Sequence, residues 1–229
     1  MNNLQKLGGI AALYMATAYL VGIILFLFVL DYPNIVDPAQ KVALLIDKPM
    51  IIYSMNLILY VIFGVFLIVL VLALYERLKV GAPAIMQVAT VIGIIWAGSL
   101  IASGMVSNAG IAPVIALYDK DPAQAALTWL EFETMASGLG NGNGEILGGL
   151  MTLLISLSAL RTGGLPKSLN YLGVVVGWVG IISTIPGLSS LTGMFGMSQI
   201  VWFVWLASIL LRSSPSAALV FDVEHVSVK

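Results

Sequence analysis

Residues 51–75 read IIYSMNLILYVIFGVFLIVLVLALY, and this run decides the fold class because it contains no charged side chain. At 1.5 Å per residue, a helix of this length rises about 37 Å, more than the roughly 30 Å of a bilayer's hydrocarbon core. Glu76, Arg77 and Lys79 follow directly after the run. A long uncharged stretch that ends in charged residues is typical of a transmembrane helix.

Further apolar runs lie on both sides of this stretch, and together they predict an all-α polytopic membrane protein, a bundle of six transmembrane helices. We expect one transmembrane domain over residues 1–212, with spans at about residues 8–30, 51–75, 85–106, 141–160, 169–186 and 192–211. Short surface helices are expected outside the cytoplasm, at residues 39–45 after the helix-start signal Asp37-Pro38 and at residues 123–136.

The composition supports the membrane class and excludes several others. The chain is 60% hydrophobic and 9% charged, with a mean hydropathy of +1.04, whereas soluble domains are about 25% charged. A formal net charge of −1 provides no basic surface for nucleic acid. The absence of cysteine excludes disulfides, thiolate metal sites and cysteine nucleophiles.

The charges predict the orientation of the bundle. Six spans place both termini on one side of the membrane, and that side then carries seven Lys or Arg residues against three on the other. Basic residues accumulate on the cytoplasmic side. We therefore predict a multi-pass protein of the inner (plasma) membrane with both termini cytoplasmic and residues 213–229 as a cytoplasmic tail. The seven are Lys6, Arg77, Lys79, Arg161, Lys167, Arg212 and Lys229, and the three are Lys41, Lys48 and Lys120.

One polar stretch, residues 138–149, interrupts the apolar pattern and reads GLGNGNGEILGG. The apolar run that follows is too short to cross a bilayer unless the fourth span begins near Asn141, which places Asn143 and Glu145 at the membrane edge. Two interpretations stay open. The segment is either an unwound stretch that lines a polar cavity or a flexible outer loop, with Glu145 solvated at the start of its helix.

Candidate ligand-binding residues follow from the polar and aromatic groups near that depth. Asn56 lies toward the outer end of the second span, and Trp178 lies near the middle of the fifth. An amide at such a position more often marks an interhelical hydrogen bond than a ligand contact, and core packing is the more common role of a tryptophan such as Trp178. The candidate set is Asn56, Asn141, Asn143, Glu145 and Trp178.

The scarcity of other polar groups argues against an enzyme. The single histidine, His225, lies in the tail, so paired-histidine haem ligation and carboxylate–histidine metal sites are excluded. No lysine lies inside a span, which excludes a retinal Schiff base. We assign no catalytic residue, no metal site and no cofactor.

Three short motifs resemble a bacterial family of small six-helix membrane proteins known as a domain of unknown function. Residues 165–173 read LPKSLNYLG, residues 144–149 read GEILGG, and residues 8–12 read GGIAA. The resemblance implies a six-helix bundle over roughly residues 4–211. It implies no activity and no catalytic residues.

Two functions are consistent with these observations. The small number of polar side chains within the spans favours a non-enzymatic accessory or structural subunit of a membrane complex. Its partners would be lipids, other subunits or further copies of the chain. The alternative is a small transporter or binder of a lipophilic ligand, with an outward-facing pocket near Glu145. A binder requires the candidate residues to converge on one cavity, whereas a subunit requires an apolar face that fits a partner.

Overall fold

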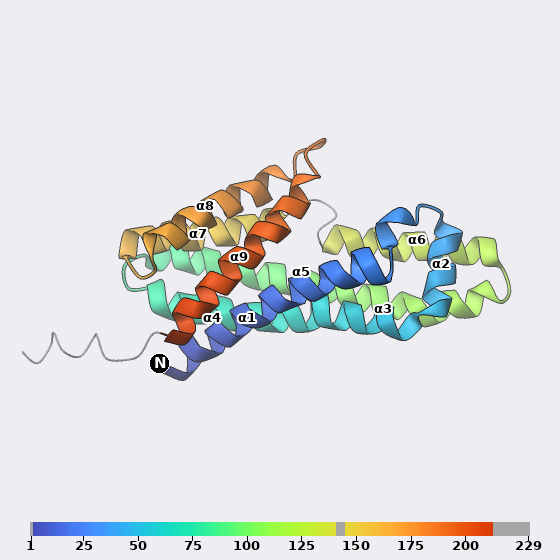
Figure 1. The fold of residues 1–229 in the computed structure, drawn as a ribbon, viewed down its shortest axis with the longest axis horizontal. Coiled ribbons are helices and arrows are strands. Elements are labelled where there is room, and N and C mark those ends of the chain that lie inside the picture. The colour runs from blue at the N-terminus through green and yellow to red at the C-terminus, as the bar shows by residue number, and fades with distance from the viewer. Residues whose placement is uncertain (1, 141–144, 213–229) are drawn as a thin grey trace, which may run out of the picture.

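The computed structural model describes residues 2–140 and 145–212, and within these ranges every regular element is a helix (Figure 1). The prediction of an all-α fold is therefore confirmed. The helices are α1 (Asn2–Ile24), α2 (Pro38–Asp47), α3 (Pro49–Asn56), α4 (Phe63–Leu78), α5 (Pro83–Tyr118), α6 (Pro122–Leu139), α7 (Ile146–Thr162), α8 (Lys167–Ile182) and α9 (Leu191–Arg212). Three shorter segments join or extend them: the π-helical η1 (Leu25–Val29) and η3 (Leu57–Ile62), and the 3-10 turn η2 (Tyr32–Asn34).

Four helices in the described part of the chain are long and apolar enough to cross a membrane, which supports a membrane protein. They cover Asn3–Val29, Pro49–Leu78, Pro83–Tyr118 and Leu191–Arg212. The two helices α7 and α8 are apolar but shorter. The number of six spans stays a prediction, and the predicted tail at residues 213–229 lies outside the described residues.

α5 differs most from the prediction, because it continues well past residue 106 to Tyr118. The sequence analysis predicted that the third span ends at about residue 106 and that a connection follows. The helix nevertheless runs through Pro113. At 36 residues it is about 54 Å long, well above the thickness of a hydrocarbon core.

The other helices are arranged along α5. α6 and then α7 run back along it, one after the other, so that each covers one half of its length (Figure 1). α2 and α3 lie near α6 at one end, whereas α4, α8, α9 and the first part of α1 gather with α7 at the other (Figure 1). A larger core contains Trp96, Trp202 and Phe203, and a second core around Leu45 and Trp129 lies beside α2 and α6.

Local signals explain several helix ends. α2 begins at Pro38, and the Asp37 carboxylate accepts a hydrogen bond from the Ala39 amide at 3.0 Å, as the sequence predicted. α6 begins in the same way, with the Asp121 carboxylate accepting from the Gln124 amide at 3.0 Å. The helix at residues 122–139 therefore forms close to the predicted bounds. Its predicted position in the membrane interface stays a prediction.

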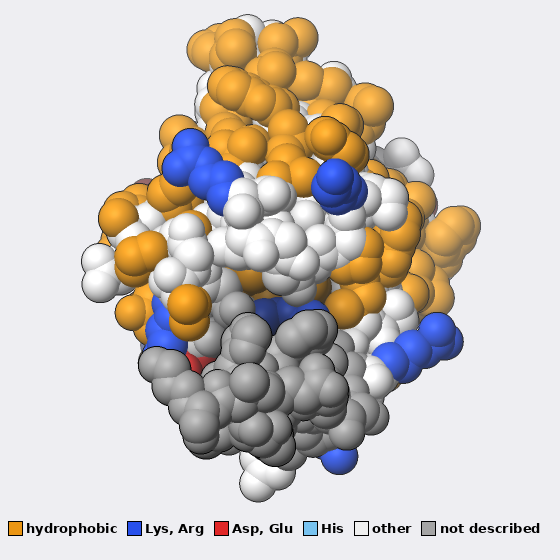
Figure 2. Space-filling model, turned by 90° about the vertical axis from the view of Figure 1, so that its left-hand side faces the viewer, with side chains coloured by type: hydrophobic (Ala, Val, Ile, Leu, Met, Phe, Trp, Pro, Cys, Tyr) orange, Lys and Arg blue, Asp and Glu red, His pale blue; other side chains and the backbone are white. Residues whose placement is uncertain are grey.

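The first and last described helices meet at one end of the molecule. A side chain at Gly9 would contact Leu211 at 2.8 Å, so α1 and α9 pack tightly there. Lys and Arg side chains surround this end (Figure 2). These side chains belong to the end that the charge pattern predicts to be cytoplasmic.

Candidate functional site

A cavity of about 530 Å³ lies between the two cores and is the candidate site. Its wall is mostly apolar and is built by α1 with η1, α3 with η3 and α4, α5, α6 and α9. The wall includes Tyr19, Phe26, Leu27, Asn56, Tyr60, Phe63, Trp96, Ser103, Trp129, Glu133, Glu145, Gly193, Gly196 and Met197.

Glu145 enters this cavity from the break between α6 and α7. It is the residue before the first turn of α7, and its backbone amide donates to the Ser183 hydroxyl at 3.0 Å. That hydroxyl in turn donates to the Gly180 carbonyl of α8 at 2.6 Å. The end of α8 thus fixes the backbone of Glu145, whose side chain lines the cavity while the residue is only 7% exposed.

The preceding helix ends against α5 through two serine hydroxyls. Ser103 donates to the Ala136 carbonyl at 2.7 Å, and Ser99 donates to the Leu139 carbonyl. The last carbonyls of a helix have no partner inside the helix. The Ala136 carbonyl also accepts from the Gly140 amide at 2.9 Å, and the two serine bonds join the end of α6 to α5.

Aromatic rings form one wall of the cavity. Tyr19 packs edge-on against Phe63 with ring centroids 5.4 Å apart, and Phe63 packs edge-on against Trp96 at 6.2 Å. Tyr60 and Glu145 line the same cavity as these rings. The carboxylate and the rings therefore belong to one site.

Two π-helical segments lie in the wall on the side of α1 and α4. η1 contributes Phe26 and Leu27, and η3 contributes Tyr60. A π-turn inserts an extra residue into a helix and is often found at functional sites. Here both π-helical segments, η1 and η3, lie where their helices line the cavity.

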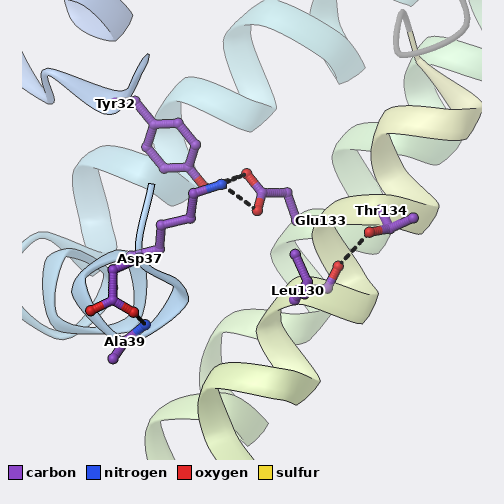
Figure 3. A network of polar contacts seen from close by, with 7 residues as sticks. Tyr32, Asp37, Ala39, Leu130, Glu133 and Thr134 are labelled. Atoms are coloured by element: carbon purple, nitrogen blue, oxygen red, sulfur yellow. Dashed lines mark hydrogen bonds and ion pairs between the residues drawn. The ribbon is translucent and has the colours of Figure 1, made fainter. Parts of the chain in front are cut away.

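Glu133 is the second carboxylate in the wall, and it is fully paired. The Lys41 ammonium donates to both of its oxygens, at 2.8 and 2.7 Å, and the Tyr32 hydroxyl donates at 2.8 Å. Figure 3 shows Tyr32 and Glu133 pointing toward one another. Burial, and then the hydrogen bond to Glu133, raise the pKa of the Tyr32 phenol, so it remains a neutral donor.

The structure places the predicted candidate residues as follows. Asn56 and Glu145 line the same cavity. Asn56 also donates to the Asn108 side chain of α5 at 3.0 Å, so the predicted interhelical hydrogen bond is present. Trp178 lies on α8, is 52% exposed and is not part of the wall. Asn141 and Asn143 lie outside the described residues.

Several cavity residues were not among the predicted candidates. Tyr19 and Tyr60 appear in the sequence as two aromatic residues within apolar runs, and only their packing brings them together. Trp129 and Glu133 could have been found from the sequence, because residues four apart lie on the same face of a helix. A tryptophan and a carboxylate on one face of α6 indicate a half-buried surface rather than a solvated one.

Within the described part of the chain, no group of three or more His, Asp or Glu residues is placed to hold a metal ion. The chemistry available at the cavity is therefore that of two carboxylates, an amide and a wall of rings.

Comparison with known proteins assigns the chain to one protein family. Searches of curated proteins and of solved structures found no match. A family model matches residues 14–213, which is most of the chain and includes the whole cavity wall. The chain therefore belongs to the family described as Domain of unknown function (DUF4386).

Proposed function

We propose that the protein is a non-enzymatic membrane protein that binds a lipophilic ligand in the cavity beside Glu145. The observation that carries the proposal is the cavity itself, about 530 Å³ in volume and lined mainly by apolar and aromatic side chains. Sites for small molecules are concave, mostly apolar and about 300–1,000 Å³, with a few polar groups that fix orientation. Glu145, Asn56, Ser103 and Glu133 are among the polar groups here.

The rim of the cavity supports entry of the ligand from the bilayer. Phe26 and Leu27 of η1 and Met197 of α9 line the cavity and are also exposed. α1 and α9 cross at the basic end and diverge toward this rim (Figure 1). A mouth made of apolar side chains suits a molecule that is dissolved in lipid.

The membrane orientation belongs to the same proposal. We place the basic end in the cytoplasm of a cell with a plasma (inner) membrane, six spans in the bilayer, and the far ends of α5 and α6 outside. Because α5 is about 54 Å long, part of the molecule extends beyond the hydrocarbon core on that side. The accessory-subunit function stays a second hypothesis.

Native mass spectrometry of protein extracted without detergent, in polymer-bounded discs, tests the proposal. Gly193 lies in the cavity wall, and a Cβ atom there would meet nothing within 4 Å, so we expect Gly193→Phe to be tolerated and to obstruct the cavity. Gly98→Phe is the matched control, because a side chain at Gly98 also begins in open space but lies outside the wall.

We expect wild type and Gly98→Phe to retain the same small molecule, and Gly193→Phe to lose most of it. The proposal is wrong if wild type carries no small molecule, or if Gly193→Phe retains it as well as wild type does. Release of a stoichiometric protein partner in place of a small molecule would favour the accessory-subunit hypothesis.

A further inference from the structure

The two carboxylates of the cavity, Glu133 and Glu145, differ in that only Glu133 has a positively charged partner among the described residues. Glu133 is bonded by Lys41 through both oxygens. From the residues that the structure describes, the Glu145 carboxylate receives no ion pair and no hydrogen bond. It is nevertheless a buried residue, and a buried carboxylate without a partner is costly.

The rest of the wall provides no positive charge for Glu145. Among the described residues that line the cavity there is no Lys, Arg or His. The sequence at residues 141–144, next to Glu145, is Asn-Gly-Asn-Gly and holds no basic residue either. The N-terminal end of α7 favours a negative charge at this position, yet a partial charge at a helix end is not a counter-ion.

The aromatic rings that line the cavity with Glu145 also suit a positively charged ligand. Tyr19, Tyr60, Phe63 and Trp96 line the same cavity as the Glu145 side chain. The face of an aromatic ring attracts cations, and the attraction grows when water is excluded. A carboxylate among rings is a complete site for an organic cation.

We propose that the ligand is a lipophilic cation, an amine or quaternary ammonium with an apolar body, whose charged group binds between Glu145 and the rings. This inference rests on the proposed function and names the class of ligand. The apolar body occupies the part of the cavity toward Met197 and Phe26. Glu133 does not compete for the charge, because Lys41 already neutralises it.

A pair of probes that differ only in charge tests the inference. The first is (biphenyl-4-ylmethyl)trimethylammonium, and the second is 4-neopentylbiphenyl, in which carbon replaces the nitrogen. Each is titrated into wild type in lipid nanodiscs, and native mass spectrometry reads the bound fraction. We expect the cation to bind at least about tenfold more tightly than its uncharged isostere, the scale of one desolvated charge contact.

Three variants assign that preference to one residue. Glu145→Gln keeps the shape of the side chain and removes its charge, so both probes should bind as weakly as the uncharged one binds wild type. Glu145→Asp retains the charge and should keep the preference. The double variant Lys41→Met/Glu133→Gln is the matched control, since it removes both members of the ion pair beside the same cavity and leaves the net charge unchanged, and it should also keep the preference.

The outcomes separate this inference from the proposed function. Equal binding of both probes to wild type overturns the cation inference and leaves the lipophilic site standing. Binding of neither probe overturns the proposed function and the inference together. Loss of the preference in Lys41→Met/Glu133→Gln, or its survival at full strength in a folded Glu145→Gln, overturns the assignment to Glu145.

Discussion

At the scale of single residues, the ion pair of Lys41 and Glu133 joins two parts of the chain that are far apart in sequence. It links α2 to α6, and the side chains are 17% and 25% exposed. Lys41 also lies over the ring of Tyr32, 5.0 Å from its centre. Breaking a pair this well enclosed costs more than breaking an ordinary surface salt bridge, because the remaining charge is left partly desolvated and without its partner.

Replacing Lys41 by Met should therefore destabilise this end of the molecule. The change leaves Glu133 half-buried with only the Tyr32 hydroxyl as a partner, and we expect the free energy of unfolding to fall by about 1–3 kcal/mol. Thermal unfolding in a mild detergent measures the loss. Lys120→Met is the control, because Lys120 is exposed in the turn after α5, and a loss of equal size in both variants would contradict the role of the pair.

The sequence could identify only part of the site at this scale. Glu145 was a candidate because it interrupts an apolar pattern, and Asn56 because it is an amide within a span. The partner of Glu133 was not predictable, since Lys41 is 92 residues away in the chain. Trp178 was a candidate because of its depth in the fifth span, yet it lies outside the cavity wall. The depth of a residue in a span does not decide which way its side chain points.

At the scale of helices, α7 and α8 approach closely because glycines meet. A side chain at Gly149 would lie 2.7 Å from the Gly177 carbonyl oxygen and 2.8 Å from the Ile181 nitrogen. Both are backbone atoms, so the clash cannot be relieved by a side-chain movement. This contact sets the position of Glu145, which precedes α7 and is bonded to the end of α8.

Gly149→Ala should push α7 and α8 apart. We expect it to lower the free energy of unfolding by about 1–3 kcal/mol through overpacking. Gly98→Ala should be neutral or stabilising by up to about 1 kcal/mol, since it adds helix propensity in open space. Unfolding in detergent compares the two, and an equal effect of both substitutions would show that the close approach does not matter.

Helix positions were largely predictable, because charged residues and prolines bound most apolar runs. Close contacts were less so. Gly177 packs closely on α7, whereas a side chain at Gly98 would meet nothing.

The length of α5 was not predictable either, although the helix runs through Pro113. Phe132 of α6 packs on Gly110 so tightly that a side chain there would lie 2.7 Å from its ring, and this packing supports a continued helix.

At the scale of the whole molecule, the account places the basic end in the cytoplasm and the turn after α5 outside. The chain has no cysteine, so single cysteines can report the side of each turn. With a membrane-impermeant maleimide on intact cells, we expect labelling of Lys120→Cys and Leu188→Cys. Lys167→Cys should react only after lysis. Labelling of Lys167→Cys in intact cells, or failure of Leu188→Cys, would contradict six spans with this orientation.

The central claim is that a lipophilic ligand binds inside the bundle rather than on its outer face. Photoaffinity labelling with an uncharged alkyl diazirine, followed by peptide mapping, tests it most directly. The account predicts adducts on Tyr19, Tyr60 and Met197 that Gly193→Phe suppresses and Gly98→Phe does not. Adducts spread over the outer face, with Trp178 labelled as strongly as Tyr60 and no effect of Gly193→Phe, would contradict it.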